Sequence, residues 1–339
     1  MPATLVTGGA GYIGSHVATA LAAAGRDFVI LDNHVNSSPV AIERVTDLIG
    51  RKVHTYDADI RDVDHVRDIV RNHDVDSVIH MAGLKAVGES VDEPLRYYDN
   101  NVAGTMMMLR ALQDTACRKF VFSSSATVYG AAEHMPIDES CPTGPTNPYG
   151  MTKLMIEHVL RDLSAADASW KIVNLRYFNP VGAHESGRIG ENPSGIPNNL
   201  MPFVSQVAAG KRAELRVFGN DWPTPDGTGV RDYIHVLDLA DGHVKALAYL
   251  DRGQADRLVT VNLGTGRGYS VFDMVRAFEK VGGVRIPYSV VARRPGDIAT
   301  CYANPAAAEK ILGWKAQRGI EDMCRDAWRW QSANPNGYR

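Results

Sequence analysis

Cysteine is scarce in this chain of 339 residues, and its four copies lie far apart. They are Cys117, Cys141, Cys301 and Cys324, and no two of them have the Cys-x-x-Cys spacing that zinc knuckles use. Scattered thiols of this kind favour neither a disulfide framework nor a zinc site. We therefore expect reduced cysteines and a cytoplasmic location.

Long apolar runs and an excess of one charge are missing as well. No apolar run approaches the roughly 20 residues of a membrane-spanning helix, so we expect no membrane association. The apolar segment Ala3–Thr7 meets a glycine-rich turn at once, which leaves no room for a signal peptide. With 36 basic and 39 acidic residues the formal net charge is −3, so no broad positive field favours nucleic acid. The 11 histidines form no His-Glu-x-x-His pattern, and we predict no metal site.

The first half of the chain alternates short β-branched runs with amphipathic helical stretches. Several runs are apolar almost throughout, as parallel strands are when helices cover both faces of their sheet. Strand, helix and strand in repeated order predict an α/β fold, a Rossmann-type doubly wound parallel sheet. The expected strands are Thr4–Thr7, Phe28–Asp32, Val53–Asp57, Ser77–Met81, Lys119–Ser123 and Ile172–Tyr177, and the expected helices include Ile13–Ala24, Asp64–His73 and Tyr98–Asp114.

The regular alternation does not continue into the second half. Glycine, proline and asparagine crowd residues 182–202 and 219–229, which is typical of long loops. Sheet-like sequence returns at Val259–Leu263. The predicted organisation is a first domain over residues 1–180, a smaller α/β C-terminal lobe over residues 181–339, and a segment near 233–263 that crosses back to the first domain.

A glycine-rich turn lies between the first expected strand and the first expected helix. Its glycines are Gly8, Gly11 and Gly14. Because glycine has no Cβ, the backbone N–H groups of such a turn can approach a phosphate, and the helix dipole adds its positive end. Glycine-rich turns are common, but one in this position is typical of dinucleotide-binding folds. The turn therefore predicts a bound pyrophosphate.

Two carboxylates follow the second and third expected strands. Asp32 stands about 18 residues after Gly14, where a carboxylate can bind both ribose hydroxyls of adenosine and repel a 2′-phosphate. This favours NAD over NADP, although Asp32 could instead start a turn with Asn33. Asp59 either contacts the adenine or caps the following helix. We predict that the first domain binds NAD.

Tyr149 and Lys153 are spaced four residues apart, which places them on one face of a helix. A phenol with a pKa of about 10 is a weak base, and a neighbouring ammonium together with the positive nicotinamide ring would lower that pKa. Lys153 can also reach the nicotinamide ribose. The Tyr-x-x-x-Lys pattern is frequent by chance, but here it follows a serine run, 123–125, at the end of a strand. We predict that Tyr149, Lys153 and Ser125 are catalytic; the alternative for the serine run is a capped loop.

With these features the chain resembles the UDP-glucose 4-epimerase family of the extended short-chain dehydrogenase/reductase superfamily. The resemblance covers nearly the whole length. The glycine turn and Tyr-x-x-x-Lys are shared by the superfamily, whereas Gly-Leu-Lys-Ala-Val-Gly-Glu-Ser and Gly-Ile-Pro-Asn-Asn-Leu are much narrower motifs. The matching segments are residues 7–16, 82–90, 97–101, 123–130, 175–184, 195–202 and 231–236.

The resemblance implies a set of ligand-binding residues. On the cofactor side it extends the residues named above to Gly8, Gly11, Tyr12, Ile13, Gly14, Asp32, Asn33, Asp59, Ile60, Ala82, Gly83, Lys85, Asn100, Tyr149, Lys153 and Phe178. Within this set Asn100 would stand behind the catalytic tyrosine. On the substrate side the implied residues are Lys85, Ser125, Tyr149, Asn179, Asn199, Leu200, Val217, Phe218, Arg231, Arg294 and Cys301.

The activity implied by the resemblance is interconversion of UDP-galactose and UDP-glucose through a 4-keto intermediate with bound NAD, as part of galactose and carbohydrate metabolism. It also implies a homodimer packed through the helices that contain Tyr98–Asp114 and Lys153–Leu163. Cys301 stands where some members of the family carry a tyrosine and others a small residue. Its small side chain resembles the members that accommodate a 2-acetamido group, so UDP-GalNAc and UDP-GlcNAc are further expected substrates.

Two other functions are compatible with part of this pattern. A nucleotide-sugar 4,6-dehydratase would need a further acid and base beside the sugar, normally an Asp-Glu pair in the serine motif, and here Ala126 and Thr127 stand in those places. A non-catalytic, NAD-sensing binding protein would be free to lose Tyr149 or Lys153, and both are present.

Overall fold

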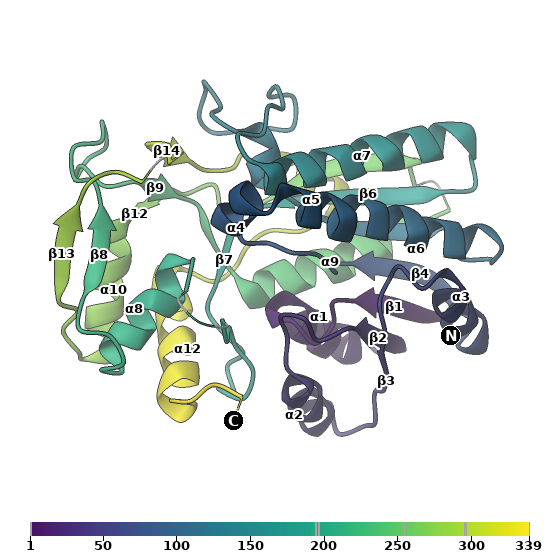
Figure 1. Cartoon of the computed structure of the whole chain (residues 1–339), viewed down its shortest axis with the longest axis horizontal. Coiled ribbons are helices and arrows are strands. Elements are labelled where there is room, and N and C mark those ends of the chain that lie inside the picture. Colours follow the sequence, from purple (N-terminus) through teal and green to yellow (C-terminus); the bar gives the residue numbers. More distant parts are fainter. Residues whose placement is uncertain (1, 194, 196, 254, 295–296, 339) are drawn as a thin grey trace.

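The computed structural model describes residues 2–193, 195, 197–253, 255–294 and 297–338. Its centre is a parallel sheet of seven strands in the order β11-β6-β5-β4-β1-β2-β3 (Figure 1). The sheet confirms the predicted Rossmann-type doubly wound fold. The strands are β1 (Ala3–Thr7), β2 (Phe28–Asp32), β3 (His54–Asp57), β4 (Val75–His80), β5 (Lys119–Ser125), β6 (Lys171–Tyr177) and β11 (Leu258–Leu263).

Helices cover both faces of this sheet. Successive side chains of a strand point to opposite faces, and accordingly Leu5 and Val6 of β1 belong to two different core clusters. The cluster around Val6 includes residues of α1 (Tyr12–Ala23), α2 (Pro39–Ile49), α9 (Val236–Leu250) and α11 (Ala306–Leu312). The cluster around Leu5 includes residues of α3 (Val63–Asn72), α6 (Gly104–Gln113) and α7 (Pro148–Ala166), and the short helices α4 (Val87–Asp92) and α5 (Pro94–Tyr97) lie beside α7.

A second lobe has its own apolar core. Its helices α8 (Leu200–Ala208), α10 (Val271–Gly282) and α12 (Ile320–Ala333) pack around the pair β8 (Leu215–Phe218) and β13 (Tyr288–Val291). Two further small sheets join the lobe to the large one: β7 (Asn179–Val181) with β10 (Tyr233–His235), and β9 (Val230–Arg231) with β12 (Tyr269–Ser270) and β14 (Thr300–Cys301).

The segment β10-α9-β11 returns from the second half of the chain to the large sheet. β11 pairs with β6 along Leu258–Leu263, and α9 packs beside α1. The strand expected at Val259–Leu263 is thus present, and it is an edge of the central sheet. The division at residue 180 stays a prediction.

Several element boundaries differ from the expectation. The helix expected over 98–114 begins as a π-helix, Tyr98–Ala103, before α6. The strand expected over 119–123 extends to Ser125, because β5 pairs with β6 as far as Ser125↔Tyr177. Both changes depend on tertiary partners rather than on local pattern. Among the described residues no helix is long and apolar enough to cross a membrane.

Candidate active site

The glycine turn brings the N-terminus of α1 to the carboxyl edge of the sheet. Gly8 has φ 71°, in the left-handed region, and a Cβ on it would lie 2.8 Å from the backbone nitrogen of Ala82. A Cβ on Gly14 would lie 2.2 Å from the carbonyl oxygen of Gly8. Within this fully described turn, Gly11 precedes α1 without a side-chain cap, and the first helical turn carries no acidic residue. The turn fits a pyrophosphate, whose oxygens would accept hydrogen bonds from the backbone N–H groups and lie at the positive end of the helix dipole.

Asp32 lies at the end of β2 with its carboxylate buried. It accepts hydrogen bonds from the backbone nitrogen of Ala10 (2.9 Å), the backbone nitrogen of His34 (2.9 Å) and the hydroxyl of Ser37 (2.8 Å). The bond to His34 closes a turn, so the turn-starting role considered from the sequence is present. The bond to Ala10 ties the same carboxylate to the glycine turn. Asp32 therefore stands beside the glycine turn, and its binding of the adenosine ribose stays a prediction.

Asp59 and Asn33 lie next to each other at the same edge. The amide of Asn33 donates to Asp59 at 3.0 Å, and the hydrogen-bonded guanidinium of Arg61 lowers the pKa of Asp59. The alternative role of Asp59 as a helix cap is wrong. The side chain that caps α3 is Asp62, which accepts from the backbone nitrogen of His65 at 3.1 Å.

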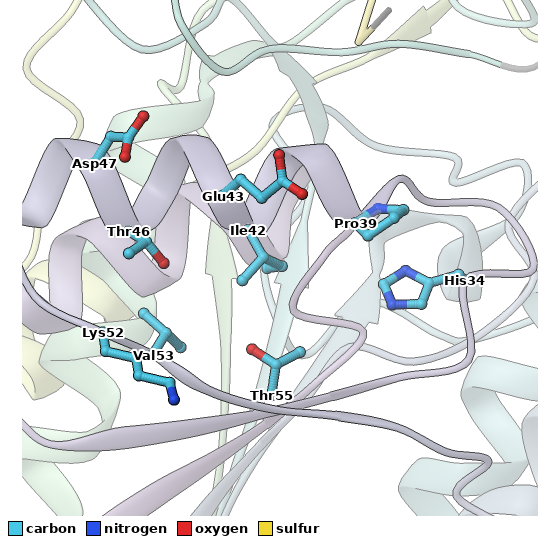
Figure 2. A pocket seen from close by; sticks show the side chains of 9 residues that line it. All are labelled: His34, Pro39, Ile42, Glu43, Thr46, Asp47, Lys52, Val53 and Thr55. Carbon is cyan, nitrogen blue, oxygen red and sulfur yellow. The ribbon is translucent and has the colours of Figure 1, made fainter.

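A surface cavity of about 450 Å³ opens beside this loop, between α2 and the chain that enters β3 (Figure 2). Ile42 and Val53 supply apolar surface, while Glu43 and Lys52 place opposite charges around it. The cavity contains none of the residues predicted from the sequence to bind cofactor or substrate. Its full lining is His34, Pro39, Ile42, Glu43, Thr46, Asp47, Lys52, Val53 and Thr55.

The three residues predicted to be catalytic come together where α7 meets the end of β5. Asn147 caps α7 by accepting from the backbone nitrogen of Gly150 at 2.9 Å, which orients the first turn that carries Tyr149. The ammonium of Lys153 donates to the carbonyl oxygen of Ser123 at 2.8 Å and lies 5.9 Å from the centre of the Tyr149 ring. The hydroxyl of Ser125 lies near the phenol of Tyr149 and lowers its pKa. All three predicted residues are buried.

Burial controls the protonation of this group. Loss of solvent raises the pKa of Tyr149 to about 12, and the nearby hydroxyl of Ser125 offsets only part of that effect. The same loss of solvent lowers the pKa of Lys153 to about 8, against the opposing charge of Glu157. The polypeptide alone therefore raises the pKa of Tyr149. The Tyr-x-x-x-Lys spacing had predicted the opposite, a pKa lowered by the ammonium of Lys153. The positive nicotinamide ring is the other group that was predicted to lower the pKa of Tyr149.

The remaining predicted cofactor residues surround this edge. The phenol of Tyr12 donates to the carbonyl oxygen of Gly182 at 2.7 Å and so links α1 to β7. Phe178 is buried between β6 and β7. Ile13 is partly buried and Ile60 buried against the two core clusters. Lys85 has an exposed side chain whose ammonium lies 3.5 Å from Glu191.

Asn100 bonds to Asn101, and Asn101 bonds to α7; the predicted place of Asn100 behind the catalytic tyrosine stays a prediction. The amide of Asn100 donates to the side-chain oxygen of Asn101 at 3.0 Å. The side chain that bonds to α7 is that of Asn101, which donates to the hydroxyl of Thr152 at 3.1 Å. Asn101 also accepts from the backbone nitrogen of Leu84 at 2.8 Å, next to Gly83. The wider turn of the π-helix directs Asn101 toward α7, a feature that the sequence pattern did not reveal.

The predicted substrate residues lie on the second lobe and on the strands that join it to the large sheet. Arg231 of β9 and Cys301 of β14 are direct neighbours in the strand register. The guanidinium of Arg294 lies 5.4 Å from the centre of the Phe218 ring, which is itself half-exposed. Asn179 belongs to β7 and is exposed. Asn199, at the start of α8, donates to Glu191 at 2.9 Å.

Two predicted substrate residues face the lobe's own core. The side chain of Val217 is 1% exposed and packs in the apolar cluster, and Leu200 packs against the same cluster. Any contact of Val217 with a ligand is therefore left to its main chain. Ile196, within the motif segment 195–202, lies outside the described residues.

A charged pair behind the catalytic group was missed from the sequence. Glu157 of α7 and Arg176 of β6 form a buried ion pair with a shortest nitrogen–oxygen distance of 2.6 Å. Glu157 follows Lys153 by one helical turn, and that spacing was the available indication. The cross-strand position of Arg176 depends on the pairing of β5 with β6.

The fold and this group of residues define a class of protein. A glycine turn at the first βα junction, with a Tyr-Lys pair and a serine at the carboxyl edge of the same parallel sheet, is the arrangement of a nicotinamide-dependent enzyme of the extended short-chain dehydrogenase/reductase type.

Comparison with known proteins narrows the class. Residues 5–327 match the family model described as GDP-mannose 4,6 dehydratase. A UDP-glucose 4-epimerase of Bacillus subtilis is 59% identical over 338 residues, which cover 99% of each chain. A crystal structure of UDP-glucose 4-epimerase from Stenotrophomonas maltophila, with bound NAD and formylated UDP-arabinopyranose, is 49% identical and superposes with a TM-score of 0.97. The enzyme of Bifidobacterium longum in complex with NAD+ and UDP is 53% identical with a TM-score of 0.95. Each of these two matches covers 99% of this chain and 99% of the chain in the crystal structure.

The chain belongs to the UDP-glucose 4-epimerase family. The family-model match places it in the wider group that also contains nucleotide-sugar dehydratases.

Proposed function

We propose that the protein is an NAD-dependent UDP-hexose 4-epimerase that interconverts UDP-galactose and UDP-glucose. The observation that carries the proposal is the buried group Tyr149–Ser125–Lys153 at the carboxyl edge of the sheet, beside the glycine turn, in a chain that matches epimerases over its full length. The proposed role belongs to galactose metabolism.

Bound NAD supplies a hydride acceptor, and then a hydride donor, for C4 of the sugar. Tyr149 is the proposed base for the 4-hydroxyl, because its phenol lies near the Ser125 hydroxyl and its ring centre lies 5.9 Å from the Lys153 ammonium. Ser125 bridges the substrate hydroxyl and the phenol. Lys153 holds a positive charge near Tyr149, and that charge favours the phenolate.

The cofactor is proposed to lie along the turn and the ends of the neighbouring strands. Gly8, Gly11 and Gly14 would expose backbone N–H groups to its pyrophosphate, and Asp32 would bind the adenosine ribose. The further proposed contacts are Tyr12, Ile13, Asn33, Asp59, Ile60, Ala82, Gly83, Lys85, Asn100 and Phe178.

The UDP group needs a firm hold, whereas the hexose must turn over between the two hydride transfers. When the 4-keto sugar presents its opposite face to the cofactor, return of the hydride inverts the configuration at C4. Arg231 and Arg294 are proposed to bind the pyrophosphate, since a guanidinium matches phosphate oxygens in bidentate fashion. Phe218, with its half-exposed ring, is proposed to lie against the uracil. Asn179, Asn199 and Leu200 are proposed to complete the UDP site.

The neighbourhood of Cys301 supports a wider substrate range. Cys301 has a small side chain that is half-buried beside Arg231. Burial raises the pKa of its thiol to about 11, so the thiol is uncharged near neutral pH. A small side chain at the sugar pocket leaves room for a 2-acetamido group. We therefore also propose interconversion of UDP-GalNAc and UDP-GlcNAc.

The dehydratase alternative is supported at the level of the family model alone, and the site does not supply the acid and base that it needs. Ala126 cannot transfer a proton, and the hydroxyl of Thr127 donates to Ser125 at 2.9 Å. The serine motif thus orients Ser125 and supplies no second acid and base. A binding protein without catalysis would have no need for the buried Tyr149–Lys153 pair.

A homodimer and a cytoplasmic location are proposed on separate grounds. Apolar side chains are exposed on four neighbouring helices, α4 to α7, which is typical of a protein interface. They are Val87, Val91, Leu95, Met106 and Met155. All four cysteines are free thiols, which supports a reducing compartment.

The test of the proposed function is the product mixture that purified protein forms from UDP-galactose, resolved by chromatography. UDP-glucose should appear with no net change in the absorbance of reduced cofactor. A Tyr149→Phe variant should lose roughly 100-fold or more in kcat while it keeps its fold and its NAD, because it lacks only the base. A 4-keto-6-deoxy product would favour the dehydratase, and no turnover of any UDP-hexose by NAD-loaded protein would contradict the proposal.

A further inference from the structure

Helix α7 and strand β5 meet at three matched points. Tyr149, Lys153 and Glu157 follow one another at intervals of four residues on α7 and so share one face. Tyr149 lies near the side chain of Ser125, and Lys153 donates to the carbonyl oxygen of Ser123 at 2.8 Å. Ser124 lies between these two serines on β5, and its hydroxyl donates to the carboxylate of Glu157 at 2.5 Å. Three consecutive serines thus face three consecutive turns of α7, and Ser123 and Ser124 hydrogen-bond to two of them.

The third point is reinforced by a buried charge. Arg176 is the direct neighbour of Ser124 in the pairing of β5 with β6. Its Nη2 lies 2.6 Å and its Nε 3.0 Å from the two carboxylate oxygens of Glu157, and both side chains are almost fully buried. Glu157 therefore attaches α7 to two strands at once.

The attachment extends across the sheet. Nη1 of Arg176 donates to the phenol oxygen of Tyr129 at 3.0 Å, and Tyr129 donates to Asn262 of β11 at 2.7 Å. The side-chain amide of Asn262 donates in turn to the carbonyl oxygen of Ile137. A single chain of polar contacts thus connects α7 with β5, β6 and β11 directly behind the predicted catalytic group.

A buried ion pair is a weak source of stability, because removing both charges from water costs about as much as their attraction returns. What such a pair does well is define one arrangement of the elements that it joins. At this position the elements are α7, which carries Tyr149 and Lys153, and the end of β5, which carries Ser125. A shift of α7 along β5 would separate the phenol from the serine hydroxyl.

We propose that Glu157, paired with Arg176, is a positioning residue that holds Tyr149 and Lys153 in register with Ser125. The inference deepens the proposed function and rests on it.

Charge also connects Glu157 with Lys153. Glu157 is the anion one turn from Lys153, and it favours the protonated form of that ammonium. The other titratable groups that face Lys153 are Tyr149, whose pKa is raised to about 12, and His80 of β4, whose pKa is lowered to about 3 by burial and then by Lys153. Both are uncharged near neutral pH.

The test compares Glu157→Gln with a matched control on the same helix, Asp162→Asn, whose carboxylate is 71% exposed. Glu157→Gln keeps the shape of the side chain and removes its charge. We expect kcat to fall roughly 10- to 100-fold with KM changed less than about threefold, because the reacting groups move while the UDP site does not. The alkaline limb of the kcat profile should move to lower pH, since both the lost anion and the unpaired Arg176 favour deprotonation of Lys153. Asp162→Asn should match the wild type in each respect.

A second readout does not depend on turnover. Carbon-13 NMR of lysine-labelled holoenzyme, with the Lys153 resonance identified by Lys153→Met, should show a lower pKa for Lys153 in Glu157→Gln. If the wild type were inactive on every UDP-hexose, the proposed function would fail while this titration still tested the link between Glu157 and Lys153. Should Glu157→Gln not fold, Ser124→Ala removes one of the contacts to Glu157 and should show a smaller drop in kcat. Wild-type kcat and an unchanged Lys153 titration, with only a lower Tm, would overturn the inference and leave Glu157 a structural residue.

Discussion

The phenol of Tyr149 and the ammonium of Lys153 are both buried, and burial opposes the charged form of each. Their pKa values are displaced in opposite directions, upward to about 12 for Tyr149 and downward to about 8 for Lys153. A base with a raised pKa needs nearby positive charge to ionise near neutral pH. Lys153 supplies that charge only below its own pKa, so activity that depends on it should decline as the pH rises through about 8.

The size of the side chain at position 301 is the proposed determinant of substrate range. Cys301→Tyr should abolish epimerisation of UDP-GlcNAc, by roughly 100-fold or more in kcat/KM, because the larger ring takes up the room for the acetamido group. Turnover of UDP-galactose should stay within a few fold. Both activities are measured by chromatography of the nucleotide sugars.

Cys301→Ser provides the control, since it retains the small volume, and it should keep both activities. Two results would contradict the proposal: absence of N-acetyl activity in the wild-type protein, and N-acetyl activity that survives in Cys301→Tyr.

The first turn of α1 is the element on which we propose that cofactor binding depends. Gly14 in this turn approaches Gly8, and Gly8 approaches Ala82, only because neither glycine has a Cβ atom. In Gly14→Ala the new Cβ would meet the carbonyl oxygen of Gly8 at 2.2 Å, so the helix has to move away from the turn. We expect the purified variant to retain less than roughly a tenth of the wild-type NAD, measured after denaturation and chromatography.

The control for that variant is Gly144→Ala. A Cβ on Gly144 meets nothing within 4 Å, so this variant should keep its NAD. Full NAD content in Gly14→Ala would show that the turn does not set the position of the cofactor.

At the scale of the whole molecule, the exposed apolar residues are concentrated on one group of helices. Leu95, at 82% exposure, is the most exposed large apolar side chain in the described chain, and Val91 lies on the preceding helix at 60%. A patch of this kind costs free energy in water unless another surface covers it. Leu95→Asp should therefore convert the proposed dimer to monomer at micromolar concentration, as seen by analytical ultracentrifugation.

The comparison variant is Val290→Asp, which places the same charge at an exposed apolar site on β13, in the second lobe. It should leave the assembly unchanged. A wild-type protein that sediments as a monomer, or a Leu95→Asp variant that sediments as a dimer, would count against an interface on these helices.

Much of the fold and part of the candidate site follow from local pattern. The strand-forming runs, the glycine turn and the four-residue spacing of Tyr149 and Lys153 were all readable, because side-chain periodicity and backbone freedom act over a few residues. Membership in the epimerase family likewise followed from short motifs along the chain.

Only the tertiary structure decided which distant segments meet. It placed β11 at the edge beside β6, turned Val217 into the core of the second lobe and directed Asn101 toward α7. It also brought Arg176 to Glu157, although the rest of α7, a loop and most of β6 separate the two along the chain. Such contacts depend on how whole elements pack and pair, and no periodicity within a single segment contains that information.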